Sequence, residues 1–206
     1  MFMRVLLGLL LSLCTGIAMA IEEPEYAVIE QSKPFELRAY QPKIVAEVQV
    51  TGSMDEASGR GFKLLADYIF GNNTARTGGN EKIAMTAPVG MEPESEKISM
   101  TAPVSMEQSG GQWRVSFVMP SQYTMETLPR PNNQAVTLRE IPETNYAVIR
   151  FSGLAGEDKI ARKTAELIEW MDEKGLEPTG QPELARYNPP WTLPFLRRNE
   201  VMIKYD

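Results

Sequence analysis

The residues that most often carry out catalysis are scarce in this sequence. It contains no histidine, and its one cysteine, Cys14, lies in an apolar N-terminal run. Histidine supplies the base of nucleophilic triads, the usual zinc ligands and the commonest axial ligand of haem iron. There is also no G-x-S-x-G turn, Gly-rich phosphate loop or Asp-rich calcium loop. The residue types therefore favour a binding protein over an enzyme, and we expect no structural metal.

Methionine thioethers occur at matching places in a repeated phrase. Residues 81–92 read EKIAMTAPVGME, and residues 96–107 read EKISMTAPVSME. If each copy is a strand, Met85 and Met100 each share a face with isoleucine, alanine and valine. Such alternation is the ordinary mark of half-buried strands, here joined as a hairpin. A flexible thioether also suits an adaptable groove for a flat ligand, so Met85 and Met100 are candidate ligand contacts.

Charged residues form two further groups. Arg197 and Arg198 are adjacent, and such a pair can hold ligand carboxylates through charge-assisted hydrogen bonds. Arginines more often make local ion pairs and backbone bonds, and this alternative stays open. The acidic cluster Glu22, Glu23 and Glu25 is most simply a solvated terminus. The formal net charge of −6 argues against nucleic acid as a partner.

Two segments that position these residues resemble each other. Residues 37–52 read LRAYQPKIVAEVQVTG, and residues 138–153 read LREIPETNYAVIRFSG. In both, a strand-like alternation ends at a glycine and a helix follows. The similarity indicates two β-β-α halves related by pseudo-symmetry, in which Gly52 and Gly153 end equivalent strands. We expect both helices on the same side of one curved sheet.

Cap signals define the two helices. Ser53 and Glu56 form a capping box that begins the first helix, which should end near Gly71. The second helix covers about residues 158–174 and ends at Gly175. The further strand candidates, which bring the total to about eight strands, are residues 113–119, 136–141, 146–152 and 200–205.

The apolar surface of the first helix is wider than one core contact needs. Leu65 lies on the core stripe, and Phe62, Ala66 and Ile69 carry the apolar surface further round the helix. A wider core contact is the simpler interpretation. One wall of a ligand groove is the functional alternative.

The N-terminal segment predicts export. Residues 1–20 read MFMRVLLGLLLSLCTGIAMA, with a basic start, an apolar run and a small-x-small site. We expect cleavage after Ala20 and a mature protein, without a membrane span, in the periplasm or secreted. The alternative is a lipoprotein acylated at Cys14, for which Leu13 is a poor preceding residue. Residues 21–206 then form a single domain made of two similar halves.

Several phrases resemble the SOUL haem-binding family, in the same order along the chain. They are KIAMTAPV, VMPSQYTMETLPRP, VIRFSG and ARYNPPWTLPFLRRNEVMI. The resemblance covers nearly all of residues 21–206. It implies an α+β fold, a pseudo-two-fold, distorted eight-stranded antiparallel β-barrel flanked by two α-helices. That fold is related to the small-molecule effector-binding domains of bacterial regulators.

The resemblance also implies reversible binding of haem or another tetrapyrrole, with no catalytic reaction. Family members place the tetrapyrrole in an apolar groove along the first helix, which here carries Phe62, Leu65, Ala66 and Ile69. The histidine proposed as an axial ligand in some members has no counterpart in this chain, so burial of the porphyrin face should outweigh iron ligation. The alternatives are a module for another small molecule and an envelope protein acting through protein contacts.

Overall fold

The structure, a computed structural model, describes residues 21–93 and 112–206. Three features of the sequence lie outside these residues. They are the expected export signal with Cys14, the second copy of the repeated phrase, and Met100 within that copy.

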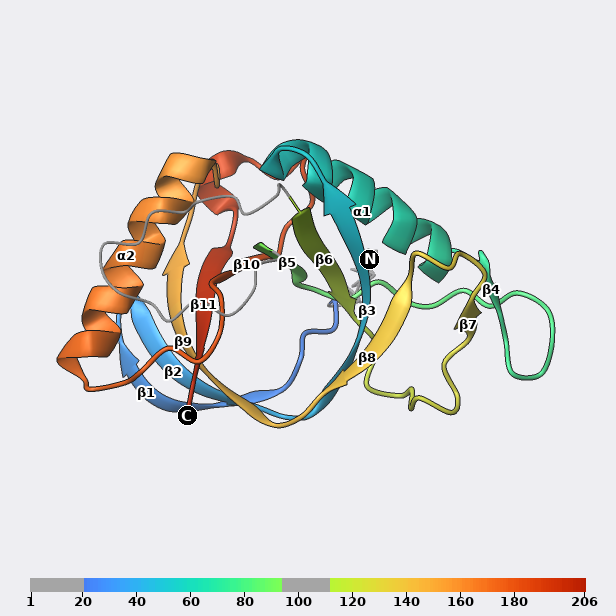
Figure 1. The fold of residues 1–206 in the computed structure, drawn as a ribbon, viewed down its shortest axis with the longest axis horizontal. Helices are drawn as coiled ribbons and strands as arrows, with labels where there is room; N and C mark the ends of the chain where they lie inside the picture. The colour runs from blue at the N-terminus through green and yellow to red at the C-terminus, as the bar shows by residue number, and fades with distance from the viewer. Residues whose placement is uncertain (1–20, 94–111) are drawn as a thin grey trace, which may run out of the picture.

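The described residues form a nine-stranded antiparallel sheet, a two-stranded sheet and two α-helices (Figure 1). In spatial order the large sheet contains β1 (Tyr26–Ser32), β2 (Phe35–Tyr40), β9 (Thr144–Phe151), β11 (Asn199–Tyr205), β10 (Glu183–Arg186), β5 (Val89–Pro93), β6 (Gln112–Val118), β3 (Lys43–Thr51) and β8 (Thr137–Ile141). The remaining elements are β4 (Asn73–Thr74), β7 (Arg130–Pro131), α1 (Met54–Ile69), α2 (Glu157–Glu173) and the 3₁₀ turn η1 (Pro194–Leu196). Figure 1 shows the sheet curled into an open half-barrel, with both helices beginning at the same end.

The two halves repeat one order of elements. β2, β3 and α1 follow one another as β8, β9 and α2 do, with a glycine between strand and helix in each half. Gly52 has φ +115° and Gly153 has φ +95°, a backbone region that favours glycine. Buried residues of both helices belong to one apolar core with Ala46 of β3 and Ile149 of β9. The predicted β-β-α repeat and the shared sheet face are confirmed.

The helix boundaries follow the predicted caps. The backbone N–H and the hydroxyl of Ser53 donate to the carboxylate of Glu56 at 3.2 and 2.9 Å. These bonds hold the first turn of α1. After α2, Gly175 has φ +67°, and its N–H donates to the carbonyl of Asp172 at 2.9 Å. Both helices therefore begin and end within about two residues of the predicted positions, the usual precision of such boundaries.

The face of the sheet opposite the helices has a polar core. The guanidinium of Arg38 donates to both carboxylate oxygens of Glu200, at 2.8 and 3.1 Å, and both side chains are fully buried. The Tyr187 hydroxyl and Nε of Arg198 also donate to Glu200, at 2.7 and 2.9 Å. Burial raises the pKa of Glu200, but the hydrogen bond and charge of Arg38, together with Arg198 and Tyr187, outweigh it and hold the pKa below its ordinary value.

One predicted strand is absent from the described residues. Residues 81–88, most of the first copy of the repeated phrase, have an irregular backbone, and β5 begins only at Val89. The N–H of Ile83 donates to the carbonyl of Ile69, the N–H of Ala87 donates to the carbonyl of Glu22, and Pro88 has no N–H. Since these groups do not join a strand ladder, the predicted strand over residues 81–88 is wrong.

We predict that Glu200→Gln destabilises the protein by about 3–5 kcal/mol at neutral pH, because it removes the fully buried carboxylate that pairs with Arg38 and leaves the ion pair with the less buried Glu36 to compensate this charge. The folded-state pKa of Glu200 lies below the ordinary value of 4.5, so this carboxylate stabilises the fold above that pH and loses its contribution as the pH falls through the folded-state pKa. Urea unfolding at neutral and acidic pH measures both effects.

The difference between wild type and Glu200→Gln should shrink as the pH falls below about 4.5. Glu169→Gln, at an exposed position of α2, is the matched control for loss of one carboxylate. An equal stability of Glu200→Gln and wild type at neutral pH would contradict the role given to this pair.

Candidate functional site

The four residues predicted on the first helix divide between two sides of α1. Leu65 and Ile69 are buried and belong to the apolar core under the helix. Phe62 is 38 % exposed, and Ala66, one turn later, is half-buried. The Phe62 ring meets the ring of Phe117 on β6 edge-on, with centroids 5.4 Å apart. The part of α1 that a ligand can reach without opening the core is therefore the flank that carries Phe62 and Ala66.

The other predicted contacts are not gathered beside this flank in a single group. Met85 is partly buried and packs against the helix-side core, while Met100 lies outside the described residues. Nε of Arg197 donates to the carbonyl of Thr192 at 2.7 Å. Arg198 donates to the carboxylates of Glu200 and Glu23, both at 2.9 Å. The arginine pair thus makes the local bonds that the sequence analysis kept as its alternative.

Arg186 is a cation beside the flank that the sequence analysis missed. It lies at the end of β10, and its guanidinium donates to the Ser58 hydroxyl of α1 at 3.2 Å and to the Ala155 carbonyl at 3.1 Å. Burial lowers the pKa of Arg186 from its ordinary value, and the charge of Asp55 opposes this shift. Ser58 and Phe62 are one helical turn apart, so the contact with Arg186 lies on the same side of α1 as the exposed aromatic ring. A short strand after Pro182 gives no sequence signal for such a contact.

An exposed apolar loop occupies the end of the molecule where both helices begin. We call residues 188–197 the apolar loop; it contains η1, which Figure 1 shows between the first turns of α1 and α2. Trp191 is 81 % exposed, and the other large exposed side chains of the loop are Leu193, Phe195 and Leu196. The carbonyl of Pro194 accepts the N–H of Gly153, which ties the loop to the junction between β9 and α2. A tied loop that still exposes aromatic side chains is typical of a binding surface.

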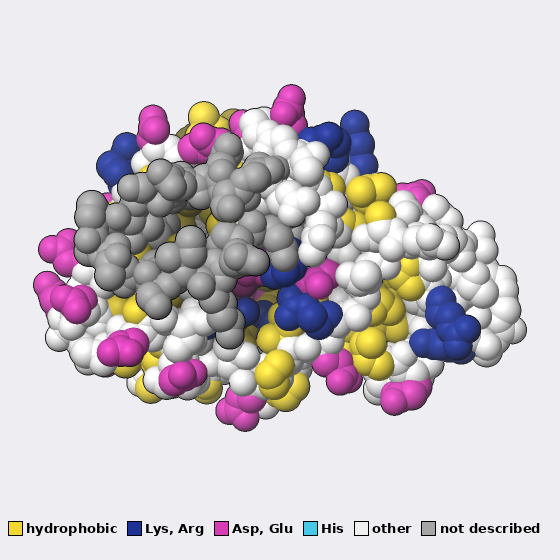
Figure 2. Space-filling view, viewed as in Figure 1, with side chains coloured by type: hydrophobic (Ala, Val, Ile, Leu, Met, Phe, Trp, Pro, Cys, Tyr) yellow, Lys and Arg dark blue, Asp and Glu magenta, His cyan; other side chains and the backbone are white. Residues whose placement is uncertain are grey.

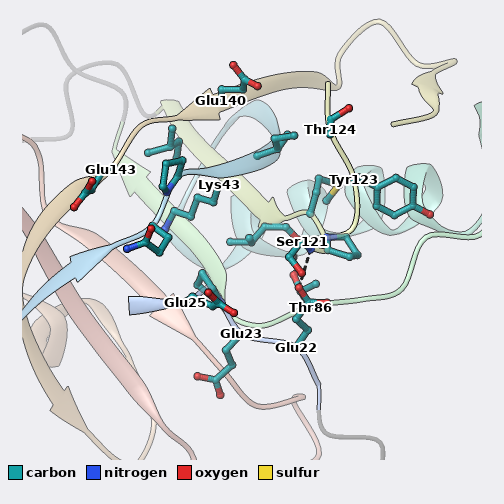
Figure 3. Close-up of a pocket in the computed structure, with 18 of the residues that line it drawn as sticks. Glu22, Glu23, Glu25, Lys43, Thr86, Ser121, Tyr123, Thr124, Glu140 and Glu143 are labelled. Atoms are coloured by element: carbon teal, nitrogen blue, oxygen red, sulfur yellow. Dashed lines mark hydrogen bonds between the residues drawn. The ribbon is translucent and has the colours of Figure 1, made fainter. Parts of the chain in front are cut away.

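A cavity lies at the other end of β3, around the β2–β3 and β8–β9 turns (Figure 3). Its volume is about 840 Å³, and Ile44, Val118 and Met119 are among its apolar lining residues. Glu22, with its neighbours Glu23 and Glu25, lines the same cavity. The acidic cluster expected as a solvated terminus is thus one wall of a cavity.

The face drawn in Figure 2 carries charges of both signs. Figure 2 shows acidic and basic side chains interspersed over the described part of the face drawn there. Within residues 21–93 and 112–206, no cluster of three or more His, Cys, Asp or Glu side chains is placed to hold a metal ion. The helices in those same ranges lack the length and apolar character that crossing a bilayer requires.

Solved structures with the same fold include one described as a hydrolase from Listeria innocua, with a TM-score of 0.56 and 12% identity over 86% of this chain and 94% of that chain. The EcmrR C-terminal domain has a TM-score of 0.56 and 11% identity over 88% of this chain and 98% of its own. EcmrR in its DNA complex has a TM-score of 0.60 and 11% identity over 84% and 57% of the two chains. At these identities the likeness shows the fold alone.

Curated protein sequences gave no match to this chain. The family model for SOUL heme-binding protein matches residues 21–204. This match extends from the first described residue almost to the end of β11 and includes both β-β-α halves, the flank of α1 and the apolar loop. The chain therefore belongs to the SOUL heme-binding protein family.

Proposed function

We propose that this protein is an exported carrier, buffer or sensor that binds haem or another tetrapyrrole reversibly, against the flank of α1. The observation that carries the proposal is the Phe62 ring, which stays exposed although it packs on Phe117, one turn from the Arg186 contact. An apolar platform beside a cation matches a ligand with a flat apolar face and carboxylate side chains. Family membership supports the ligand class.

Burial of the porphyrin face supplies the affinity in this proposal. Apolar surface removed from water contributes about 25 cal/mol per Å² before the cost of association, so contact with a few side chains supports micromolar binding. The chain has no histidine, so an iron bond would fall to a softer or weaker ligand such as a methionine thioether. The described methionines of the repeated phrase are Met85, half-buried against the same core, and Met91, which is buried in it.

Arg186 is the proposed partner of a propionate. A guanidinium has five N–H donors in a planar fork, which exceeds the two hydrogen bonds to Ser58 and Ala155. Its planar shape suits bidentate contact with a carboxylate. In addition to burial, Arg197 of the apolar loop lies near enough to Arg186 for its positive charge to lower the pKa of that guanidinium. The loop therefore offers further exposed apolar side chains in the neighbourhood of Arg186.

We predict that Phe62→Asp weakens the binding of haemin and of iron-free protoporphyrin alike, by about 1–3 kcal/mol, because it removes an apolar contact and places a charge against the porphyrin face. Absorbance titrations with both porphyrins give the two dissociation constants. Ala165→Asp, at an exposed position of α2, is the control, and circular dichroism verifies both folds. Unchanged binding to Phe62→Asp would place the site elsewhere. Binding of haemin but not of protoporphyrin by wild type would show that iron ligation dominates.

The proposed role of Arg186 has its own test. Arg186→Met should weaken the binding of protoporphyrin by about 1.5–3 kcal/mol, the range for a hydrogen bond to a charged group, and should leave the affinity for its dimethyl ester nearly unchanged. Arg186→Lys keeps the positive charge and should recover part of the loss. If both porphyrins lose the same affinity in Arg186→Met, the residue acts only by tying β10 to α1.

Export is tested independently of ligand binding. We predict that the native protein begins at Ile21, because signal peptidase cleaves after the small-x-small site that ends at Ala20. The intact mass of protein purified from the native host, together with cell fractionation, measures this. A chain that retains Met1 in the cytosol would contradict export, and an acylated Cys14 would support a membrane-anchored form instead.

A further inference from the structure

The cavity at the β2–β3 and β8–β9 turns has an ordered acidic wall. The N–H of Ala87 donates to the carbonyl of Glu22 at 2.9 Å, and the N–H of Gln41 donates to the carbonyl of Glu25 at 3.0 Å. The Glu22 carboxylate accepts the N–H of Ser121 at 2.7 Å, the bond drawn in Figure 3. Residues 22–25, which precede β1, are thus held against three other parts of the chain and form an ordered wall.

The ionisable side chains of this cavity are strongly unbalanced. Five glutamates and one lysine line it, namely Glu22, Glu23, Glu25, Lys43, Glu140 and Glu143. Arg198 neutralises Glu23 through a bond of 2.9 Å. The ammonium of Lys43 lies over the ring of Tyr40, with 4.6 Å to the centroid, and over the more distant ring of Tyr146. Since Lys43 is drawn toward the tyrosines behind the wall, an excess of negative charge faces the cavity.

The carboxylates surround the cavity from two sides. Glu22 and Glu25 belong to the wall before β1, while Glu140 and Glu143 come from β8 and the turn that follows it. Figure 3 shows Glu140 and Glu143 at the outer rim and Glu25 nearer the centre. Carboxylates placed around an opening attract cations and raise their local concentration there.

The apolar residues that line the cavity favour an organic cation over a metal ion. In the described part of the chain, no three acidic side chains come close enough together to chelate a metal ion. The space between them is lined by apolar side chains, including Ile44, Val118 and Ile141. Apolar walls with a few polar groups are typical of sites for small organic molecules, and about 840 Å³ lies within the volume range of such sites.

We propose that this cavity binds an organic cation with an apolar body, held by Glu25, Glu140 and Glu143. The site goes beyond the proposed tetrapyrrole function and takes a ligand of opposite charge, because these carboxylates would repel the propionates of a porphyrin. Lys43 and Thr51 are the two ends of β3, so the cavity lies roughly 25 Å along that strand from the point where the chain enters α1.

A pair of rhodamine dyes tests the proposal. The methyl ester of the dye is a lipophilic cation, and the free acid, which differs by one methyl group, is a zwitterion at neutral pH. Fluorescence anisotropy with the full chain should show binding of the cation and at least roughly tenfold weaker binding of the zwitterion, since the field of the carboxylates acts on net charge. Haemin should not displace the cation, and Phe62→Asp should leave its binding unchanged.

The triple variant Glu25→Gln, Glu140→Gln and Glu143→Gln should weaken binding of the cation by roughly tenfold or more. The control variant, with the same loss of charge at exposed positions, is Glu169→Gln, Glu173→Gln and Glu177→Gln. Failure of the cation to bind, equal binding of the zwitterion, or equal loss in both triple variants would each overturn the proposal. Displacement by haemin would show that the dye occupies the tetrapyrrole site. If the wild-type protein binds the cation but neither porphyrin, the proposed tetrapyrrole function is wrong and the proposed cation site is still supported.

Discussion

The buried ion pair of Arg38 and Glu200 constrains the whole half-barrel. The two residues lie on β2 and β11 with β9 between them, so their side chains reach across a strand. Separating these charges in the interior would leave Arg38 with Glu36 and Glu200 with Arg198, which compensate each charge only in part, and the cost of that loss holds three strands in register. Arg198 extends the pair to Glu23, 175 residues away in sequence. The same network that closes the polar core therefore also fastens the wall of the acidic cavity.

The two faces of the sheet carry different residues, because successive side chains along each strand point to opposite faces. On β2, Leu37 packs under the helices, while Arg38 and Tyr40 belong to the opposite face. The helix side is filled by apolar residues from both halves. Since the core buries only one stripe of each helix, the flank of α1 remains available, and its exposed Phe62 distinguishes it from the charged exposed side of α2.

The two proposed binding regions carry opposite charges. The region at the start of α1 combines an aromatic ring, an exposed apolar loop and the guanidinium of Arg186. The cavity at the opposite end of β3 combines apolar walls with carboxylates. The two proposals therefore assign an anionic flat ligand and a cationic ligand to different ends of one small domain. Neither proposal invokes a histidine, since the chain has none.

Local sequence signals determined the two helices, their caps and the β-β-glycine-α order of both halves, because capping and strand alternation depend on residues close together in the chain. The edge strand β1 and the four-residue β10 gave no such signal, since exposed or very short strands lack a clear alternation. Only the tertiary structure decided that Ile69 is core while Ala66 is flank, and that Glu23 meets Arg198. These outcomes depend on which surfaces meet after folding, and such contacts join residues that no local pattern connects.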